Sequence, residues 1–277
     1  MGSYLRPGEL NEALAALAAR PRVILAGGTD YYPARVGRPI DDDVLDITSL
    51  SSLKAIARTD GAWRIPALAT WSDVIAAELP PILDGLKLAA REVGGVQIQN
   101  AGTVCGNLCN ASPAADGIPN PLAPDARVEL ASAGGRREVP VSEFVTGNRR
   151  TARRPDELVT AVLVPAPKGE ARSTFLKLGA RKYLVISIVM VAAVVETEGG
   201  AIAAARVAVG SCSAAAKRLL ALEQRLVGKK LSPALAETVR PSDLSPLSPI
   251  DDVRGTAAYR SDVALTLIGR ALAGLAR

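Results

Sequence analysis

The sequence predicts an α+β protein built from two domains, and three observations support this fold class. The chain has 277 residues, which is about twice the usual size of one domain. Short apolar runs typical of strands alternate with stretches in which leucines recur at helical spacing. A proline- and glycine-containing stretch at 165–169 divides the chain, and the strand pattern changes after it. We therefore expect domains at 1–168 and 169–277.

The first domain is expected to consist of two lobes, at about 1–57 and 58–168. Leucines three and four residues apart predict an amphipathic helix over 9–20 at the start of the first lobe. Short apolar runs follow this helix, and the double glycine at 27–28 comes directly after the first of them. The strands expected in this lobe are 23–26, 44–47 and 53–56.

The second lobe is expected to combine helices with further strands. Ser72 and Asp73 predict the cap of a helix that ends at Ala77, and a second helix is expected over 80–93. Pro66 cannot donate a hydrogen bond to a neighbouring strand, so it should lie at an edge or at a strand end. The strands expected are one within 62–71 and three at 126–130, 137–141 and 158–164.

The C-terminal domain is expected to be a small three-stranded α+β unit. Its strands are predicted at 175–178, 186–195 and 201–209, and its helices at 214–226 and 259–275. The prolines and serines of 241–249 indicate a turn-rich surface segment between the helices. Strands and flanking helices of this kind form a compact layered domain.

The composition excludes several kinds of site. The chain has no histidine, which excludes histidine general acid–base catalysis, Ser-His-Asp triads, most zinc hydrolase sites and histidine-ligated haem. Cys105, Cys109 and Cys212 are too few for a four-thiolate iron–sulfur cluster, and small buried side chains in a reducing compartment are the simpler interpretation. We expect no metal site, so demanding chemistry must come from a bound organic cofactor or another subunit.

Charge and hydropathy indicate neither a nucleic-acid partner nor a membrane span. The net charge is +5, but lysines and arginines are scattered and aromatic residues make up only 3% of the chain. The longest apolar run, Leu184 to Val195, is about twelve residues, too short to cross a bilayer. The polar, amphipathic start shows no secretory signal, so a cytoplasmic location is expected.

Two glycine-containing segments, 24–31 and 101–107, concentrate the residues suited to binding a ligand. Each combines glycine, which permits tight backbone curvature, with hydroxyl or amide side chains. Such a turn can direct several backbone N–H groups at one anion. Neither segment contains lysine or arginine, which argues against an ATP-hydrolysing loop. One such segment alone is more often a connecting turn, but two in this order with these flanks are less easily explained as turns.

The two segments together resemble the paired flavin-binding loops of the FAD-binding (medium) subunits of molybdenum hydroxylases, the xanthine dehydrogenase and aerobic carbon monoxide dehydrogenase family. Further motifs at 175–182 and 250–260 also resemble this family, so the resemblance covers nearly the whole chain. Three positions depart from the family pattern. Pro66 stands where glycine is common in the family. Cys105 stands where the family has a glycine, and Val185 stands where it often has an acidic residue.

The resemblance implies a two-lobed FAD-binding domain of the vanillyl-alcohol-oxidase/PCMH type, followed by a C-terminal domain of the carbon monoxide dehydrogenase flavoprotein type. It also implies one non-covalent FAD, extended between the lobes with its diphosphate over the two glycine segments. The residues implied to bind FAD are Ile24, Leu25, Ala26, Gly27, Gly28, Thr29, Asp30, Tyr31, Val93, Thr103, Val104, Cys105, Gly106, Asn107, Asp116, Val159 and Lys177.

Several of these residues have a role implied by the resemblance. Thr29, Thr103 and Asn107 would donate to phosphate or ribitol oxygens, and Asp116 would accept a hydrogen bond from a ribose hydroxyl or from the flavin. Lys177 would be the catalytic residue, because a positive charge beside the isoalloxazine stabilises the reduced flavin.

Plainer interpretations exist for three residues. Asp116 could form an Asx turn before Gly117. Lys177 could be a surface lysine. Tyr183 could stack on the flavin ring, although a core or surface tyrosine is the simpler interpretation.

The implied function is electron transfer inside a hetero-oligomer, expected to be a dimer of heterotrimers. A large molybdopterin subunit would oxidise the substrate, a small iron–sulfur subunit would relay the electrons, and FAD in this chain would deliver them to NAD, a quinone or another acceptor. Two alternatives are a stand-alone FAD-dependent reductase of the same fold and a flavin-free interaction module. The motif around Arg254 and the lack of an evident proton donor count against the reductase.

Overall fold

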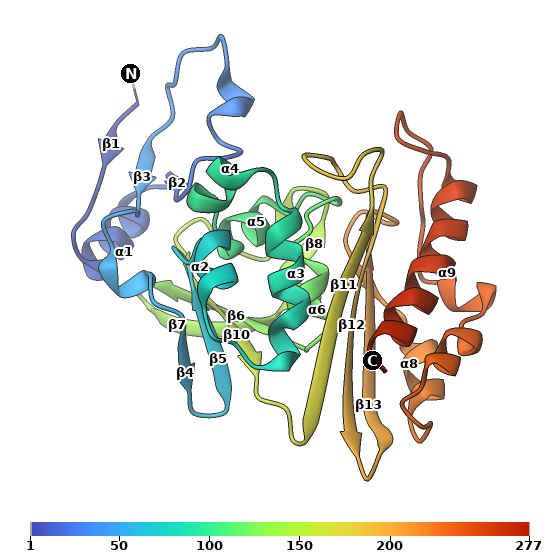
Figure 1. Ribbon diagram of the computed structural model, residues 1–277. Helices are drawn as coiled ribbons and strands as arrows, with labels where there is room; N and C mark the ends of the chain where they lie inside the picture. Colours follow the sequence, from blue (N-terminus) through green and yellow to red (C-terminus); the bar gives the residue numbers. More distant parts are fainter. Residues whose placement is uncertain (1, 277) are drawn as a thin grey trace.

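The structure, a computed structural model, describes residues 2–276 and contains two packed parts (Figure 1). The N-terminal part has one main sheet in each lobe and a further two-stranded ribbon, with helices between the main sheets and the C-terminal part. The C-terminal part is a sheet of long strands with helices α8 and α9 on its outer face. Within the described residues, no helix is long and apolar enough to cross a membrane.

The first lobe holds a parallel sheet in the order β1-β3-β2. Helix α1 begins where the side chain of Glu12 accepts from the backbone N–H of Glu9, at 3.4 Å, and it buries Leu14 and Leu17. The predicted helix and the first two predicted strands are thus confirmed. The elements are β1 (Tyr4–Leu5), α1 (Leu10–Ala19), β2 (Val23–Leu25) and β3 (Val44–Asp46).

The strand predicted over 53–56 is wrong. Ser51–Leu53 is a 3-10 helix, and the following strand, β4 (Ala57–Thr59), pairs with a strand of the second lobe. Leu53 and Ile56 are three residues apart, a spacing that a helical turn, not a strand, places on one side of the backbone. Both contact the core, Leu53 fully buried and Ile56 partly.

The second lobe is organised around an antiparallel sheet in the order β4-β5-β10-β6-β7. Pro66 is the last residue of β5, which agrees with the strand-end position expected for it. The four strands added to β4 are β5 (Ala62–Pro66), β6 (Arg127–Ser132), β7 (Gly135–Pro140) and β10 (Leu158–Pro165). Strands β8 (Val145–Gly147) and β9 (Arg150–Thr151) pair with each other in a separate two-stranded ribbon, which was not predicted.

Six helices accompany this sheet, and the predicted caps need one correction. Helix α2 is capped by Thr70, whose hydroxyl accepts from Asp73 N at 3.1 Å, whereas Ser72 lies inside the helix. The helix predicted over 80–93 divides into a 3-10 turn, Pro81–Leu83, and α3. The helices are α2 (Trp71–Ala76), α3 (Asp84–Glu92), α4 (Val96–Ala101), α5 (Val104–Asn110), α6 (Pro119–Leu122) and α7 (Val141–Phe144).

The C-terminal sheet has the order β11-β12-β13-β14 and is antiparallel throughout. Three of its strands overlap the predicted ones, although β11 begins five residues earlier than expected, and the fourth, of two residues, was not predicted. Its members are β11 (Glu170–Leu178), β12 (Val189–Glu198), β13 (Ala201–Gly210) and β14 (Lys217–Arg218). Helices α8 (Leu220–Leu226) and α9 (Ala257–Gly274) pack against β13 and β12.

The helix predicted over 214–226 therefore begins six residues later than expected, at Leu220. Lys217 and Arg218 extend the sheet instead, paired with Val209 and Ala208. The turn-rich segment contains a 3-10 helix, Pro241–Leu244.

Central strand β12 explains why the sequence around it is continuously apolar. Successive residues of a strand point to opposite faces, and here both faces are buried. Met190, Ala192 and Val194 join the core shared with the N-terminal part, whereas Val189 and Val191 join the core under α8 and α9. The N-terminal part therefore packs against one face of this sheet.

Candidate functional site

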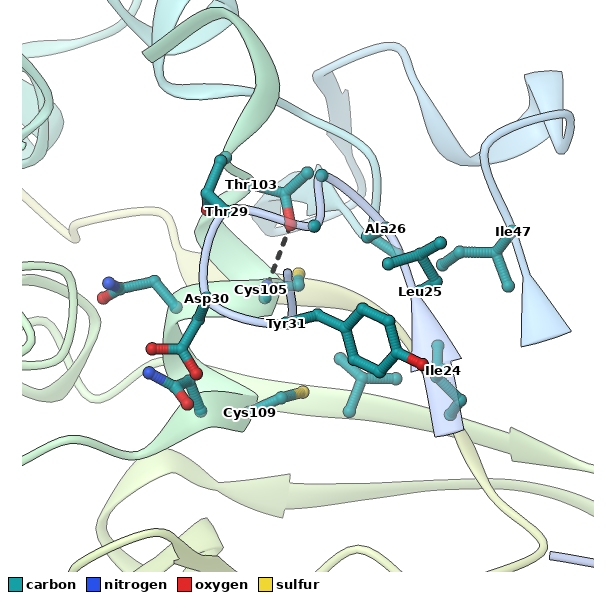
Figure 2. Close-up of a pocket in the computed structure, with 18 of the residues that line it drawn as sticks. Ile24, Leu25, Ala26, Thr29, Asp30, Tyr31, Ile47, Thr103, Cys105 and Cys109 are labelled. Atoms are coloured by element: carbon teal, nitrogen blue, oxygen red, sulfur yellow. Dashed lines mark hydrogen bonds between the residues drawn. The ribbon is translucent and has the colours of Figure 1, made fainter. Parts of the chain in front are cut away.

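The two glycine segments predicted from the sequence contact each other in the structure. A Cβ atom placed on Gly27 would lie 1.7 Å from the carbonyl oxygen of Ala101, so only glycine allows this approach. Gly28 has φ +68°, a left-handed conformation that favours glycine, and a Cβ there would lie 2.6 Å from the Tyr32 ring. We call this contact between 26–31 and 101–107 the glycine crossing (Figure 2).

The first segment of the glycine crossing offers a row of unpaired donors. Among residues 2–276, the backbone N–H groups of Gly27, Gly28, Thr29, Asp30 and Tyr31 have no acceptor in the protein. Such groups are paired in most folded proteins unless they face water or a ligand. Five in succession along a curved backbone are suited to an anion.

The second segment was predicted to be a turn, but in the structure it forms the start of helix α5. Thr103 caps this helix, and its hydroxyl accepts from Gly106 N at 2.9 Å (Figure 2). Asn107 Oδ1 accepts from Gly117 N at 3.1 Å, so its amide N–H groups stay available. Cys105 is buried, with Sγ 3.6 Å from Ile65 O, which shows how a thiol replaces glycine here.

A cavity of about 610 Å³ runs along the glycine crossing, and most of the predicted binding residues line it. A volume in this range is ordinary for a small-molecule or cofactor site. The predicted residues in the lining are Ile24, Leu25, Ala26, Gly27, Gly28, Thr29, Asp30, Tyr31, Val93, Thr103, Cys105, Gly106, Asn107 and Val159. Val104, Asp116, Lys177 and Tyr183 do not line it.

Other lining residues were not singled out by the sequence. Three of them are cationic, although the glycine segments themselves contain no lysine or arginine: Arg22, Arg35 and Arg153. The only sequence signal that could have indicated Arg22 was its position, directly before the apolar run. Gly102, which belongs to the second glycine segment, also lines the cavity. The remaining unpredicted residues are Val23, Ile47, Ala67, Trp71, Ile98, Cys109, Asn110 and Leu158.

Tyr31 is fixed at the rim of the cavity by a polar cluster. Its hydroxyl donates to Asp42 Oδ2 at 2.9 Å, and the guanidinium of Arg35 lies 3.7 Å from the ring centre. Arg35 Nε also donates to Asp42 at 2.7 Å. Burial and the hydrogen bond to Asp42 raise the pKa of Tyr31, so its hydroxyl stays neutral and its ring forms a fixed wall.

Asp116 and Lys177 form a buried ion pair apart from the cavity lining. Lys177 Nζ lies 2.7 Å from Asp116 Oδ2, and the Ser187 hydroxyl donates to the other carboxylate oxygen at 2.5 Å. Burial raises the pKa of Asp116, although Lys177 and Ser187 act in the opposite direction. The Asx turn considered for Asp116 is not its main contact. Tyr183 is 63% exposed on the adjoining loop.

Comparison with known proteins identifies the family. Residues 1–167 match the model of the FAD binding domain in molybdopterin dehydrogenase, and residues 174–275 match that of the CO dehydrogenase flavoprotein C-terminal domain. The chain belongs to this family of FAD-binding subunits. FAD is therefore its cofactor, and the chain is part of an oxidoreductase.

Curated relatives span the whole chain. The glyceraldehyde dehydrogenase medium chain of Sulfolobus acidocaldarius is 30% identical over 97% of this chain and 96% of its own length. A putative xanthine dehydrogenase FAD-binding subunit of Escherichia coli is 30% identical over 96% and 92%.

Solved structures agree on the fold. Carbon monoxide dehydrogenase from Hydrogenophaga pseudoflava matches with a TM-score of 0.86 at 26% identity, covering 99% of this chain and 96% of that one. Quinoline 2-oxidoreductase from Pseudomonas putida 86 matches with a TM-score of 0.88 at 26% identity, covering 100% and 97%. These matches confirm the predicted two-part fold class.

The geometry of the cavity fits FAD. The row of unpaired N–H groups at Gly27 to Tyr31 suits a diphosphate, and the apolar side chains beside it suit flat rings.

Proposed function

We propose that this chain is the electron-transferring FAD subunit of a molybdenum hydroxylase. In this proposal it takes electrons from iron–sulfur clusters of a partner subunit and passes them to NAD, a quinone or another acceptor. The observation that carries the proposal is the row of five unpaired N–H groups at the glycine crossing, in a chain that offers no histidine. FAD, when bound, supplies the capacity to exchange electrons either singly or in pairs.

The chain's own residues would then bind, orient and shield the cofactor. The N–H groups of Gly27 to Tyr31 would hold the diphosphate, while the Thr103 hydroxyl and the Asn107 amide donate beside it. Apolar side chains such as Val159 would exclude water from the walls. This arrangement fixes where the cofactor lies and leaves the redox chemistry to it.

We propose that Asp116 and Lys177 form one end of the FAD site, next to Val93. Lys177 Nζ lies 3.5 Å from Glu92 O, one residue before the cavity-lining Val93. We propose that its charge favours the reduced cofactor, as the catalytic role requires. Because Asp116 partly neutralises that charge, a redox titration should detect a modest shift when Lys177 is replaced by Met, and superimposable midpoints would remove Lys177 from the site.

The proposed partners are a small iron–sulfur subunit and a large molybdopterin subunit, in a dimer of heterotrimers. Relatives with a comparable length are named as medium chains or FAD subunits of larger dehydrogenases. We propose a division of the chain at 168/169, next to the boundaries of the two family models. The three free thiols favour a cytoplasmic location.

Assembly and turnover test this proposal directly. The chain should be co-expressed with the products of neighbouring reading frames, and the purified complex should contain FAD, iron, sulfide and molybdenum in stoichiometric amounts. The isolated chain should bind FAD but oxidise no organic substrate. Turnover of a defined substrate with NADPH by the isolated chain, at about 1–10³ s⁻¹, would establish the stand-alone reductase instead. A colourless chain that takes up no flavin would support the interaction module.

A further inference from the structure

Cys105 and Cys109 lie one turn apart on α5, and both line the cavity. Residues four positions apart on a helix lie on the same face, and Figure 2 shows the two sulfur atoms on the same side of α5. Burial and, after it, the neighbouring Cys109 raise the pKa of Cys105, so the two thiols lie within electrostatic reach of each other. The cavity wall therefore carries a pair of thiols and not an isolated cysteine.

This thiol pair is a feature of the chain and not of the family pattern. Cys105 stands where the family has a glycine, and both thiols are free. In the proposed FAD site neither thiol has a role, because backbone N–H groups, a hydroxyl and an amide hold the diphosphate. The two thiols are therefore available to another ligand.

The helical spacing of the pair suits a bridging ion better than a disulfide. Cβ atoms four residues apart on a helix are about 5–6 Å apart, whereas a disulfide requires about 3.8 Å between them. Two metal–sulfur bonds of about 2.3 Å each supply the length that a direct sulfur–sulfur bond lacks. An ion can thus join the two thiols while α5 stays helical.

The number of ligands determines which ion fits. Among residues 2–276, no group of three or more histidine, cysteine, aspartate or glutamate side chains is placed to hold a metal ion. Structural zinc sites are almost always four-coordinate, so two thiols alone do not suit zinc. Thiolates select soft ions such as Cu(I), and such d¹⁰ ions form stable complexes with only two of them.

Charge and access are compatible with an ion between the thiols. Cu(I) with two thiolates carries one negative charge, and the positive charge of Arg153, which also lines the cavity, acts on Cys109. Cys109 is partly exposed, whereas Cys105 is 2% exposed and has its Sγ 3.6 Å from Ile65 O. A thiol is a weak donor, so little is lost when this contact is broken. An ion in the cavity therefore meets Cys109 first and recruits Cys105 by a rotation of its side chain.

We propose that Cys105 and Cys109 bind one soft d¹⁰ cation, represented by Cu(I), in the apoprotein, and that the bound ion competes with FAD for the cavity. Binding joins one Cu(I) to two thiols and releases their two protons, with no change of oxidation state. The ion and the cofactor compete because both occupy the wall formed by α5. The ion is thus an antagonist of cofactor loading and not a resident metal of the enzyme. Only the competition rests on FAD as the occupant of this cavity.

Anaerobic titration of the apoprotein with Cu(I), in competition with the coloured chelator bicinchoninate, tests the site. The wild-type chain should bind one Cu(I) with two sulfur neighbours in X-ray absorption. Cys105→Ser and Cys109→Ser should each weaken binding at least about hundredfold, because the second thiol acts as an intramolecular ligand. Cys212→Ser removes a buried thiol outside the cavity and should bind Cu(I) as the wild type does. Saturating FAD should weaken Cu(I) binding, and Cu(I) should weaken FAD binding to the wild type but not to Cys109→Ser.

Three results would decide against the thiol site. Undiminished Cu(I) affinity in Cys105→Ser and Cys109→Ser would show that the ion binds elsewhere. Loss of binding in Cys212→Ser would assign it to that thiol. Equal Cu(I) affinity with and without FAD would overturn the competition. If circular dichroism shows that Cys105→Ser is unfolded, Cys109→Ser decides alone. Failure of the wild-type chain to bind FAD would overturn the cofactor site, whereas the Cu(I) titration would still decide on the thiol pair.

Discussion

Lys177 Nζ lies 2.7 Å from Asp116 Oδ2, and this ion pair ties strand β11 to the segment that follows α5. The two side chains are 6% and 9% exposed. Lys177 Nζ also donates to Val185 O at 3.3 Å, and Asp116 accepts from Ser187. The pair therefore fixes the loop after β11 against the N-terminal part, whatever charge it presents to the cofactor.

Replacing Lys177 with Met should destabilise the apoprotein by about 3–5 kcal/mol, because Asp116 would stay buried without its partner. The double variant Lys177→Met/Asp116→Asn should recover much of this loss, since no isolated charge remains. Urea unfolding of the apoprotein measures both, with exposed Lys182→Met as control. Equal stability of Lys177→Met and Lys182→Met would contradict a structural role for the pair.

Replacing Gly27 with Ala should separate the two segments of the glycine crossing. The new methyl group would meet the Ala101 carbonyl oxygen at 1.7 Å, so the backbone must move. We expect a loss of about 1–3 kcal/mol in unfolding free energy and a clear loss of FAD affinity. Gly147→Ala is the control, because no atom lies within 4 Å of a Cβ at that position. Wild-type FAD affinity in Gly27→Ala would show that the crossing does not shape the site.

The sequence indicated the two segments of the glycine crossing, though not their contact, because the signal of each is local. Glycine, hydroxyl and amide residues follow a strand in one segment and open a helix in the other, and each pattern is legible over six residues. Which side chains of the second segment line the cavity was less clear from the sequence, because helical geometry decides this. In α5, Val104 and Leu108 are one turn apart and both face the core, so Val104 does not line the cavity although its neighbours Thr103 and Cys105 do.

Long-range contacts could not be predicted from the sequence, for a different reason. Asp116 and Lys177 are 61 residues apart, and Arg153 lines the cavity although it is far along the chain from both glycine segments. Nothing in the residues around either position indicates its partner. The same holds for β14, since two residues at a sheet edge carry no periodic pattern.

Replacing Glu157 with Gln should change how stability depends on pH. Burial opposes ionisation of Glu157, but hydrogen bonds from Arg137, at 2.6 and 2.9 Å, and from the Arg154 N–H outweigh it and lower the pKa. A lowered pKa in the folded state contributes stability above the unfolded value of about 4.3, and this stability is lost as the pH falls through the folded value.

At pH 7, Glu157→Gln should therefore be less stable than wild type by about 1–3 kcal/mol, and the difference should shrink as the pH falls below about 4. Chemical unfolding from pH 3 to 8 measures the two curves, and Glu143→Gln, at an exposed position, serves as control. Parallel curves over this whole range would mean that the ionised form of Glu157 adds nothing.

Cys109 should report FAD binding through its reactivity. Burial raises the pKa of its thiol to about 11, against the opposing charge of Arg153, so at pH 8 only about one thiol in a thousand is ionised. Because Cys109 lines the cavity and is partly exposed, it should react slowly with a thiol reagent in the apoprotein. Reaction should accelerate about tenfold for each pH unit up to about pH 11, and bound FAD should suppress it. Cys212 is buried outside the cavity and serves as the internal control, resolved by peptide mass analysis after labelling. Equal labelling of Cys109 with and without FAD would place the cofactor away from the wall formed by α5.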